Sequence, residues 1–368
     1  KILPMSLEDI ISQTIRQKSK PIGFDVFMNL ALYSPNNGYY RCNASVIGRQ
    51  GDFITAPETS DLFGYSLARQ CKQVLNKNAS ILEFGAGNGV LAAQILFELA
   101  RLNSLPKKYY ILELSAQLKQ QQYDTISKVL PELVDIVEWL SELPNSFSGV
   151  VIANEVLDAM PAKRLMFSDG RFFELGVDYI DGQFQWHLFD EPFLESMKIP
   201  TVNFIEGYKT EINLQALAWI ESLYEAMSDG LVLLIDYGMD RIEYFHPQRS
   251  EGTLRCYHKH KASDDPFVNV GKQDITTSVN FSDIADRASD TGFEILGYCN
   301  QAMFLLSLGI QDYLLEEKDI EKRIQLAQQI KQLILPSSMG ESFKVLALSK
   351  KLTVKLDGFR EQNLTGKL

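Results

Sequence analysis

The stretch Ser80-Ile-Leu-Glu-Phe-Gly-Ala-Gly-Asn-Gly-Val-Leu91 decides the fold class of this chain. Four strand-like residues run into a turn that contains Gly85, Gly87 and Gly89, and an apolar pattern with helical spacing follows. In an α/β sheet, a strand, a glycine turn and a helix in this order let a cofactor lie against the backbone. The stretch therefore predicts a nucleotide-type cofactor site, although an ordinary strand-to-helix turn has the same three parts.

The spacing of the glycines indicates which cofactor to expect. A dinucleotide site uses G-x-G-x-x-G to bring pyrophosphate oxygens to a helix N-terminus, but here the spacing is G-x-G-x-G and Val90 stands in place of the last glycine. Glu83, just before the turn, would attract an amino group and repel a phosphate. A second apolar run ends in Glu113, a carboxylate suited to ribose hydroxyls. These features favour S-adenosylmethionine, which carries a sulfonium and an ammonium group but no phosphate. The residues expected to bind it are Glu83, Gly85, Ala86, Gly87, Gly89, Glu113 and Leu114.

Composition excludes several other classes. The chain has 368 residues, and 36 basic residues against 47 acidic ones give a net charge of -11. Because no long Lys/Arg cluster appears, we expect no nucleic acid partner. The four cysteines are scattered and form no C-x-x-C pair, which fits a reducing compartment such as the cytoplasm. No apolar stretch is long enough to cross a bilayer, so we expect no membrane insertion.

The chain alternates strand and helix patterns from Ile81 onward, which predicts an α/β protein with a doubly wound, mostly parallel sheet. We expect an N-terminal helical lobe with a cofactor-covering loop over 1–77 and the first part of the core over 78–166. Two glycine turns between aromatic-rich segments predict antiparallel strands over 167–210, inserted into the parent sheet. The core resumes over 211–239, a loop-rich insertion over 240–282 is expected to form a lid, and 283–368 completes the core with a long helical stretch over 301–335.

The candidate catalytic residues follow the fourth predicted core strand, in the segment Ala153-Asn-Glu-Val-Leu-Asp-Ala-Met-Pro161. The C-terminal end of that strand borders the crevice where open α/β sheets bind substrates. Glu155 and Asp158 are three residues apart and would share one face if a helix begins here, so they could clamp a guanidinium, with Asn154 beside them. The simpler interpretation is that Asp158 caps a helix and Glu155 is solvated.

Two further segments could lie on the substrate side. Asp236 and Tyr237 end the fifth core strand at the same sheet edge, although carboxylates at strand ends often only cap loops. Arg255 and His258 belong to a segment that also contains His260. A His-x-His pair near aspartates could bind a metal ion, but the spacing matches no specific site, so we predict a hydrogen-bonded lid and no metal.

Several segments together resemble the MidA-type methyltransferases, a family with mitochondrial and bacterial members. The resemblance covers the chain from about residue 23 to the end. The matching segments are Gly51-Asp-Phe-Ile-Thr-Ala-Pro-Glu58, Leu82-Glu-Phe-Gly-Ala-Gly87, Glu113-Leu-Ser115, Asn154-Glu-Val-Leu-Asp-Ala-Met-Pro161, Asp236-Tyr-Gly238, Gly252-Thr-Leu-Arg-Cys-Tyr257, Asp265-Pro-Phe267, Gly271-Lys-Gln-Asp-Ile-Thr276 and Met339-Gly-Glu-Ser-Phe-Lys344.

This resemblance implies a class I methyltransferase fold (Rossmann-like, with a seven-stranded, mostly parallel sheet) and, by analogy with the eukaryotic branch, symmetric dimethylation of an arginine on a respiratory complex I subunit. It also places Asp52, Thr55 and Pro57 beside the cofactor. A eukaryotic relative would act in the mitochondrial matrix and a bacterial one in the cytoplasm.

Three functions stay open at this stage. The first is a protein-arginine methyltransferase, the second a methyltransferase with a small-molecule acceptor, and the third a binding factor that holds the cofactor without transferring a methyl group. The oligomeric state is equally open, because the apolar residues Phe304, Leu305 and Leu308 suit a contact inside the chain or between subunits.

Overall fold

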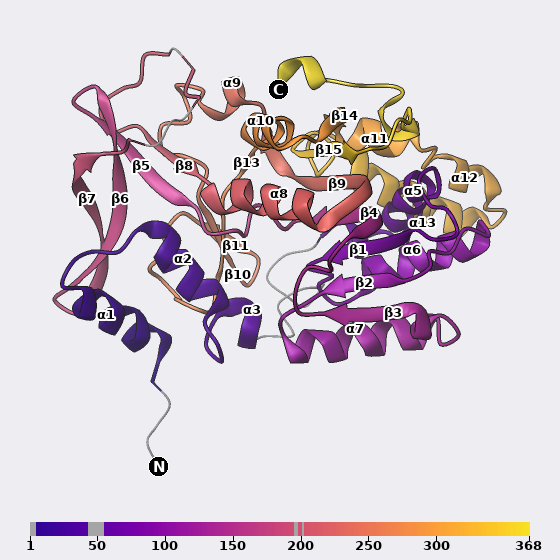
Figure 1. Cartoon of the computed structure of the whole chain (residues 1–368), viewed down its shortest axis with the longest axis horizontal. Coiled ribbons are helices and arrows are strands. Elements are labelled where there is room, and N and C mark those ends of the chain that lie inside the picture. The colour runs from indigo at the N-terminus through magenta and orange to yellow at the C-terminus, as the bar shows by residue number, and fades with distance from the viewer. Residues whose placement is uncertain (1–4, 43–54, 195–197, 201) are drawn as a thin grey trace.

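The computed structural model describes residues 5–42, 55–194, 198–200 and 202–368. It has a larger lobe built on a central sheet and a smaller lobe made of the N-terminal helices and two small sheets, which lie on the right and left of Figure 1.

The central sheet follows the order β14-β15-β9-β4-β1-β2-β3, and a short strand, β13, pairs with the end of β9. Strands β3, β2, β1, β4 and β9 pair in parallel, whereas β15 runs antiparallel to both of its neighbours. This order confirms the predicted mostly parallel, class I methyltransferase sheet. The strands are β1 (Ser80–Phe84), β2 (Tyr109–Leu112), β3 (Val137–Leu140), β4 (Phe147–Asn154), β9 (Met227–Met239), β13 (Val279–Asn280), β14 (Glu294–Asn300) and β15 (Phe343–Lys350).

Helices cover both faces of this sheet, which is why its central strands are continuous apolar runs rather than alternating ones. Neighbouring residues of β1 illustrate this, since Ile81 packs into the core on one face and Leu82 into the core on the other. The first face is covered by α5 (Asp61–Lys72), α6 (Val90–Arg101), α7 (Ala116–Val129), α11 (Gln301–Ser307) and α13 (Ile320–Ile334), and the second by α8 (Leu214–Ala226) and α10 (Phe281–Thr291).

The smaller lobe has its own apolar core, to which three separate parts of the chain contribute. Phe24 and Phe27 from the N-terminal helices pack with Val177 of one small sheet and Ile275 of the other. The helices are α1 (Leu7–Lys18), α2 (Phe24–Tyr33) and α3 (Tyr39–Cys42). One sheet has the order β7-β6-β5-β8, made of β5 (Lys163–Ser168), β6 (Arg171–Ile180), β7 (Gln183–Pro192) and β8 (Lys209–Ile212). The other is β11-β10-β12, made of β10 (Arg255–His258), β11 (Lys261–Ser263) and β12 (Asp274–Thr276).

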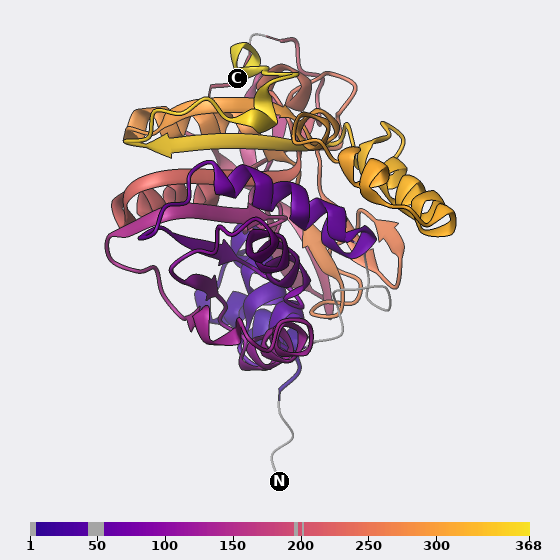
Figure 2. The same cartoon turned by 90° about the vertical axis from the view of Figure 1, so that its right-hand side faces the viewer.

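Two sequence expectations about these elements are wrong. The strands within 167–210 do not join the parent sheet, because their inward residues, such as Val177, pack on the N-terminal helices. The helix expected over 301–335 is broken into α11, α12 (Asp312–Glu316) and α13. The chain turns after α11 at Gly309, whose φ is +74°, and α13 begins anew with Asp319 as its N-cap. The α12–α13 segment stands out from the side of the molecule, in orange-yellow in Figure 2.

The remaining elements are short. They are α4 (Ala56–Thr59), α9 (Arg241–Tyr244) and the 3₁₀ turns Val134–Ile136, Asp357–Phe359 and Thr365–Lys367. Helix α5 packs on α6 in the larger lobe, although its sequence lies within the region expected to form the N-terminal lobe. Within the described ranges, no helix is both long and apolar enough to cross a membrane.

Candidate functional site

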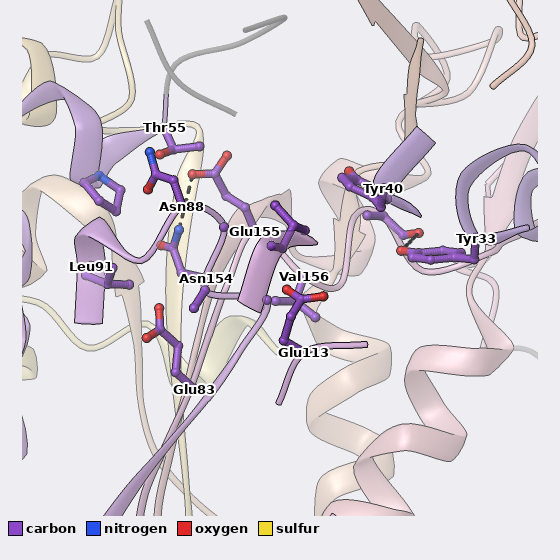
Figure 3. Close-up of a pocket in the computed structure, with 16 residues that line it drawn as sticks. Tyr33, Tyr40, Thr55, Glu83, Asn88, Leu91, Glu113, Asn154, Glu155 and Val156 are labelled. Carbon is purple, nitrogen blue, oxygen red and sulfur yellow. Dashed lines mark hydrogen bonds between the residues drawn. The ribbon is translucent and has the colours of Figure 1, made fainter. Parts of the chain in front are cut away.

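A cavity opens at the C-terminal ends of β1, β2 and β4, where the two lobes meet (Figure 3). It holds about 920 Å³ of space between atoms, including its open mouth. The described residues that line it are Tyr33, Tyr40, Thr55, Pro57, Glu83, Gly85, Ala86, Gly87, Asn88, Leu91, Glu113, Leu118, Asn154, Glu155, Val156 and Ala159.

The glycine turn forms one wall of the cavity. Gly85, Gly87 and Gly89 have φ values of +60°, +53° and +85°, the left-handed region that other residues adopt only with strain. Gly89 also has no room for a side chain, because a Cβ there would lie 2.9 Å from the Cα of Gln122. The turn is therefore a tight backbone surface facing the cavity, as its spacing suggests.

The charged residues that line the described wall are all acidic. They are Glu83, Glu113 and Glu155, and no lysine, arginine or histidine is among the lining residues. Burial raises the pKa of Glu83 to about 7, even though the hydroxyl of Tyr109 donates a hydrogen bond of 2.7 Å to it. Such a lining suits a cationic ligand and disfavours a phosphate.

Glu113, just after β2, is held in a fixed orientation. One carboxylate oxygen accepts a hydrogen bond from the backbone N–H of Ser115 (2.8 Å) and the other accepts one from the amide of Gln122 (3.1 Å). Each oxygen has a second lone pair with which it could accept a further hydrogen bond. A carboxylate fixed in this way can receive a pair of hydroxyl groups from a ligand in the cavity.

The segment after β4 is a turn and not the first turn of a helix, so the expected shared helix face of Glu155 and Asp158 is wrong. Glu155 has a φ of +53°, and its backbone N–H donates to the carbonyl of Ile235 (2.8 Å). The amide of Asn154 donates to the Glu155 carboxylate at 3.3 Å. This geometry turns the Glu155 side chain into the cavity (Figure 3). Asp158 is 5% exposed and does not line the cavity.

The carboxyl groups of this turn have strongly shifted pKa values. Burial, and then the neighbouring Asp158 carboxyl, raise the pKa of Glu155 to about 8. Burial also raises the pKa of Asp158 to about 6. At neutral pH, Glu155 is therefore mostly protonated, and a cation beside it would favour its ionised form, because the cation compensates for the lost hydration.

Asp236 supports this turn from behind. It is fully buried at the end of β9, where one oxygen accepts from the backbone N–H groups of Leu157 (3.0 Å) and Asp158 (3.2 Å) and the other from that of Tyr237 (2.9 Å). Neither Asp236 nor Tyr237 lines the cavity. The geometry therefore gives Asp236 the loop-capping role that sequence reasoning held as the alternative.

Other expected residues lie away from the cavity or outside the described chain. Leu114 is 58% exposed and does not line the cavity. Arg255 is exposed and donates to the carbonyl of Leu254, and Nδ1 of His258 lies 2.6 Å from the carbonyl of Lys272. Asp52 is outside the described residues, whereas Thr55 and Pro57 line the cavity. In the part of the chain that the structure describes, no cluster of His, Cys, Asp or Glu could hold a metal ion.

Sequence reasoning missed most of the apolar and aromatic lining. Tyr33 and Tyr40 come from the N-terminal helices, and their rings stack at 5.5 Å. Tyr33 donates to the carbonyl of Ala159 (2.9 Å) and Tyr40 to the carboxylate of Asp274 (2.7 Å). Only the three-dimensional packing of the lobes brings them to the site, although a pair of tyrosines around a turn-rich stretch is a signal that could have been followed.

The sheet order, with the glycine turn after β1 and a carboxylate after β2, defines a class I methyltransferase. The family model described as "Putative S-adenosyl-L-methionine-dependent methyltransferase" matches residues 63–299, and the chain belongs to this family.

A solved structure shows the same fold and a ligand. It is a Burkholderia thailandensis protein bound to S-adenosyl-homocysteine, which is 38% identical, has a TM-score of 0.94, and aligns over 98% of this chain and 96% of its own. A native structure from the same organism has a TM-score of 0.91 over the same shares.

Curated relatives are more distant. Protein arginine methyltransferase NDUFAF7, mitochondrial, from Homo sapiens is 28% identical over 89% of this chain and 80% of its own length. The Drosophila melanogaster homologue is 26% identical over 89% and 81%.

These comparisons confirm the predicted family and cofactor, S-adenosylmethionine. The residues that line the cavity fit that cofactor independently, because its sulfonium and ammonium charges match a lining that has three carboxyl groups and no basic residue among the described positions.

Proposed function

We propose that this chain methylates an arginine of a protein substrate, giving symmetric dimethylarginine, and that the substrate is linked to respiratory complex I assembly. The observation that carries the proposal is the turn after β4, where Glu155 lines the cavity and the buried Asp158 carboxyl is near enough to raise the pKa of Glu155. A guanidinium is a planar cation that pairs with carboxylates through charge-assisted hydrogen bonds. The names of the curated relatives, all protein arginine methyltransferases, support the same acceptor.

The glycine turn and Glu113 hold the cofactor in this proposal. Backbone groups of the turn from Gly85 to Gly89, of which residues 85–88 line the cavity, receive its methionine and adenosine portions, and the carboxylate of Glu113 accepts hydrogen bonds from its ribose hydroxyls. Thr55 and Pro57 close the same wall. When bound, S-adenosylmethionine supplies an electrophilic methyl carbon to an acceptor nitrogen, which then loses one proton.

The turn after β4 orients the acceptor and takes that proton. Glu155 ionises as the guanidinium enters, and its carboxylate aligns one nitrogen toward the methyl group and excludes water from between them. Its pKa is about 8 before the guanidinium enters, and the carboxylate formed on entry then accepts the proton that the methylated nitrogen loses. Asn154 holds the Glu155 carboxylate, and Asp158 adds negative charge behind it.

The direct test is incubation of the purified chain with methyl-labelled S-adenosylmethionine and proteins from a respiring cell. We expect label on arginine, identified as symmetric dimethylarginine by mass spectrometry. A Gly87→Val variant is the control without a cofactor site, because φ at residue 87 is +53° and a β-branched residue cannot adopt it without strain. Label found only in small molecules would contradict the protein acceptor.

A further inference from the structure

Gln122 on α7 is a buried polar residue that the proposed chemistry does not use. It does not line the cavity, but it contacts two residues that do, Gly87 and Glu113. Its side chain is fully buried, yet every polar atom of its amide has a partner. The amide nitrogen donates to the carbonyl of Gly87 (2.9 Å) and to the carboxylate of Glu113 (3.1 Å), and the amide oxygen accepts from the indole N–H of Trp139 (2.9 Å). One side chain therefore joins the glycine turn, the end of β2, helix α7 and strand β3.

The orientation of this amide is determined by its partners. An indole nitrogen can only donate, so the atom that faces Trp139 must be the amide oxygen. The two remaining partners, a carbonyl and a carboxylate, can only accept, so they must face the amide N–H₂ group. The amide thus has one orientation that satisfies all three contacts, and the reversed orientation would leave the buried amide and its three half-buried partners without these hydrogen bonds.

The helix backbone also touches the turn. The Cα of Gln122 would lie 2.9 Å from a Cβ at Gly89, which is closer than atoms of a real side chain approach. Gln122 therefore fixes the position of the turn twice, through its backbone at Gly89 and through its amide at Gly87. The same amide fixes Glu113 on the other side of the cavity wall.

We propose that Gln122 is a positioning residue that sets the distance between the glycine turn and Glu113, and that it makes the site selective for ribonucleoside ligands with both ribose hydroxyls. The proposal rests on the placement of the cofactor ribose on Glu113 in the proposed function. A carboxylate that is free to rotate would lose alignment with the two hydroxyls, whereas one tied to the turn keeps it.

The test compares the binding of S-adenosylhomocysteine and of its 2′-deoxyribose analogue by calorimetry. A Gln122→Met variant keeps the size of the side chain and removes its hydrogen bonds. In the wild type we expect a preference of about tenfold for the ribose form, which is typical for one hydrogen bond to a charged group. In Gln122→Met we expect the preference to fall to about twofold, with weaker binding of the ribose form. Gln120→Met, the same change on the exposed side of α7, should bind both ligands as the wild type does.

A double-mutant cycle that combines Gln122→Met with Glu113→Gln distinguishes a positioning role of Gln122 from a general destabilisation of the fold. If Gln122 acts through Glu113, then Gln122→Met should add little to the loss that Glu113→Gln causes alone. Trp139→Phe removes the donor to the amide oxygen together with part of the indole ring, and leaves the amide N–H₂ contacts of Gln122 in place. It should reduce the ribose preference by a smaller factor and serves if the first variant does not fold.

Two outcomes would overturn the inference: an unchanged ribose preference in folded Gln122→Met and Trp139→Phe, or full additivity with Glu113→Gln. A wild type that binds neither ligand would refute the cofactor placement and this inference with it. The acceptor is tested separately, because a chain that shows the expected ribose preferences and methylates no arginine would contradict only the proposed acceptor.

Discussion

At the scale of single residues, the site depends on carboxyl groups that are buried, which disfavours their ionised form. Glu83, Glu155 and Asp158 all have raised pKa values, with burial as the largest cause. The residue types and their order along the chain could be predicted from the sequence. Their protonation could not, because burial depends on which other segments cover the turn.

The pH dependence of catalysis follows from Glu155. Its pKa is raised to about 8, so it is mostly neutral at pH 7 in the free protein and must ionise to hold a guanidinium. We therefore expect kcat/KM for an arginine peptide to rise with pH up to about 8 and then level off, because this ratio reports the free protein. Glu155→Gln should lower activity at least about 100-fold and leave no such rise. A pH-independent kcat/KM between pH 6 and 9 in the wild type would contradict the role of Glu155.

The free energy of unfolding should depend on pH through the titration of Glu83. Folding raises the pKa of this carboxyl from 4.5 to about 7, so the folded state favours its protonated form. The free energy of unfolding therefore falls as pH rises from the unfolded pKa to the folded one. Glu83→Gln has no such titration. Its unfolding free energy relative to the wild type should therefore increase by about 3 kcal/mol between pH 4 and pH 8, measured by urea denaturation. A difference that stays constant over this range would show that Glu83 is not the buried acid described here.

At the scale of elements, the strand β1, the glycine turn and α6 could be predicted because their pattern is local. The turn after β4 could not, because Glu155 adopts a left-handed conformation that its hydrogen bond to β9 stabilises. The break of the helix at Gly309 was missed for a similar reason, since a single glycine inside an apolar helical pattern is often tolerated.

The contact between the glycine turn and α7 at Gly89 can be tested against a matched control, Gly170. Gly89 and Gly170 both have positive φ values, +85° and +77°, but a Cβ at Gly170 would meet nothing within 4 Å. Gly170→Ala should therefore cost about 1 kcal/mol from backbone strain alone and leave S-adenosylhomocysteine binding unchanged. Gly89→Ala adds a collision with α7, so it should cost more and weaken binding at least about tenfold. Equal effects of the two variants on binding would mean that the contact with α7 is irrelevant.

At the scale of the whole molecule, the cavity is a junction between lobes, and the sequence did not reveal this. The predicted helical lobe, β insertion and loop insertion turn out to share one apolar core, which brings Tyr33 and Tyr40 to the cofactor side of the larger lobe. Contacts between segments so distant in sequence leave no local periodicity. The mostly parallel sheet followed from the sequence, whereas the packing of one lobe on the other did not.

The turn after β4 is held from both lobes, and this allows a test of the junction. From the larger lobe, Asp236 accepts from its backbone N–H groups, and from the smaller lobe the hydroxyl of Tyr33 donates to the carbonyl of Ala159. Tyr33→Phe removes that one donor and leaves a buried carbonyl unpaired, at a cost of about 1 kcal/mol.

Because the lost contact positions the acceptor turn and not the glycine turn, we expect Tyr33→Phe to raise KM for an arginine peptide several-fold. The affinity for S-adenosylhomocysteine, measured by calorimetry, should change less than about twofold. Tyr179→Phe in β6, a tyrosine of the same lobe that does not line the cavity, is the matched control and should alter neither value. If Tyr33→Phe had a normal KM but bound the cofactor more weakly, the hydrogen bond from Tyr33 would serve cofactor binding. The smaller lobe would then not help to position the acceptor.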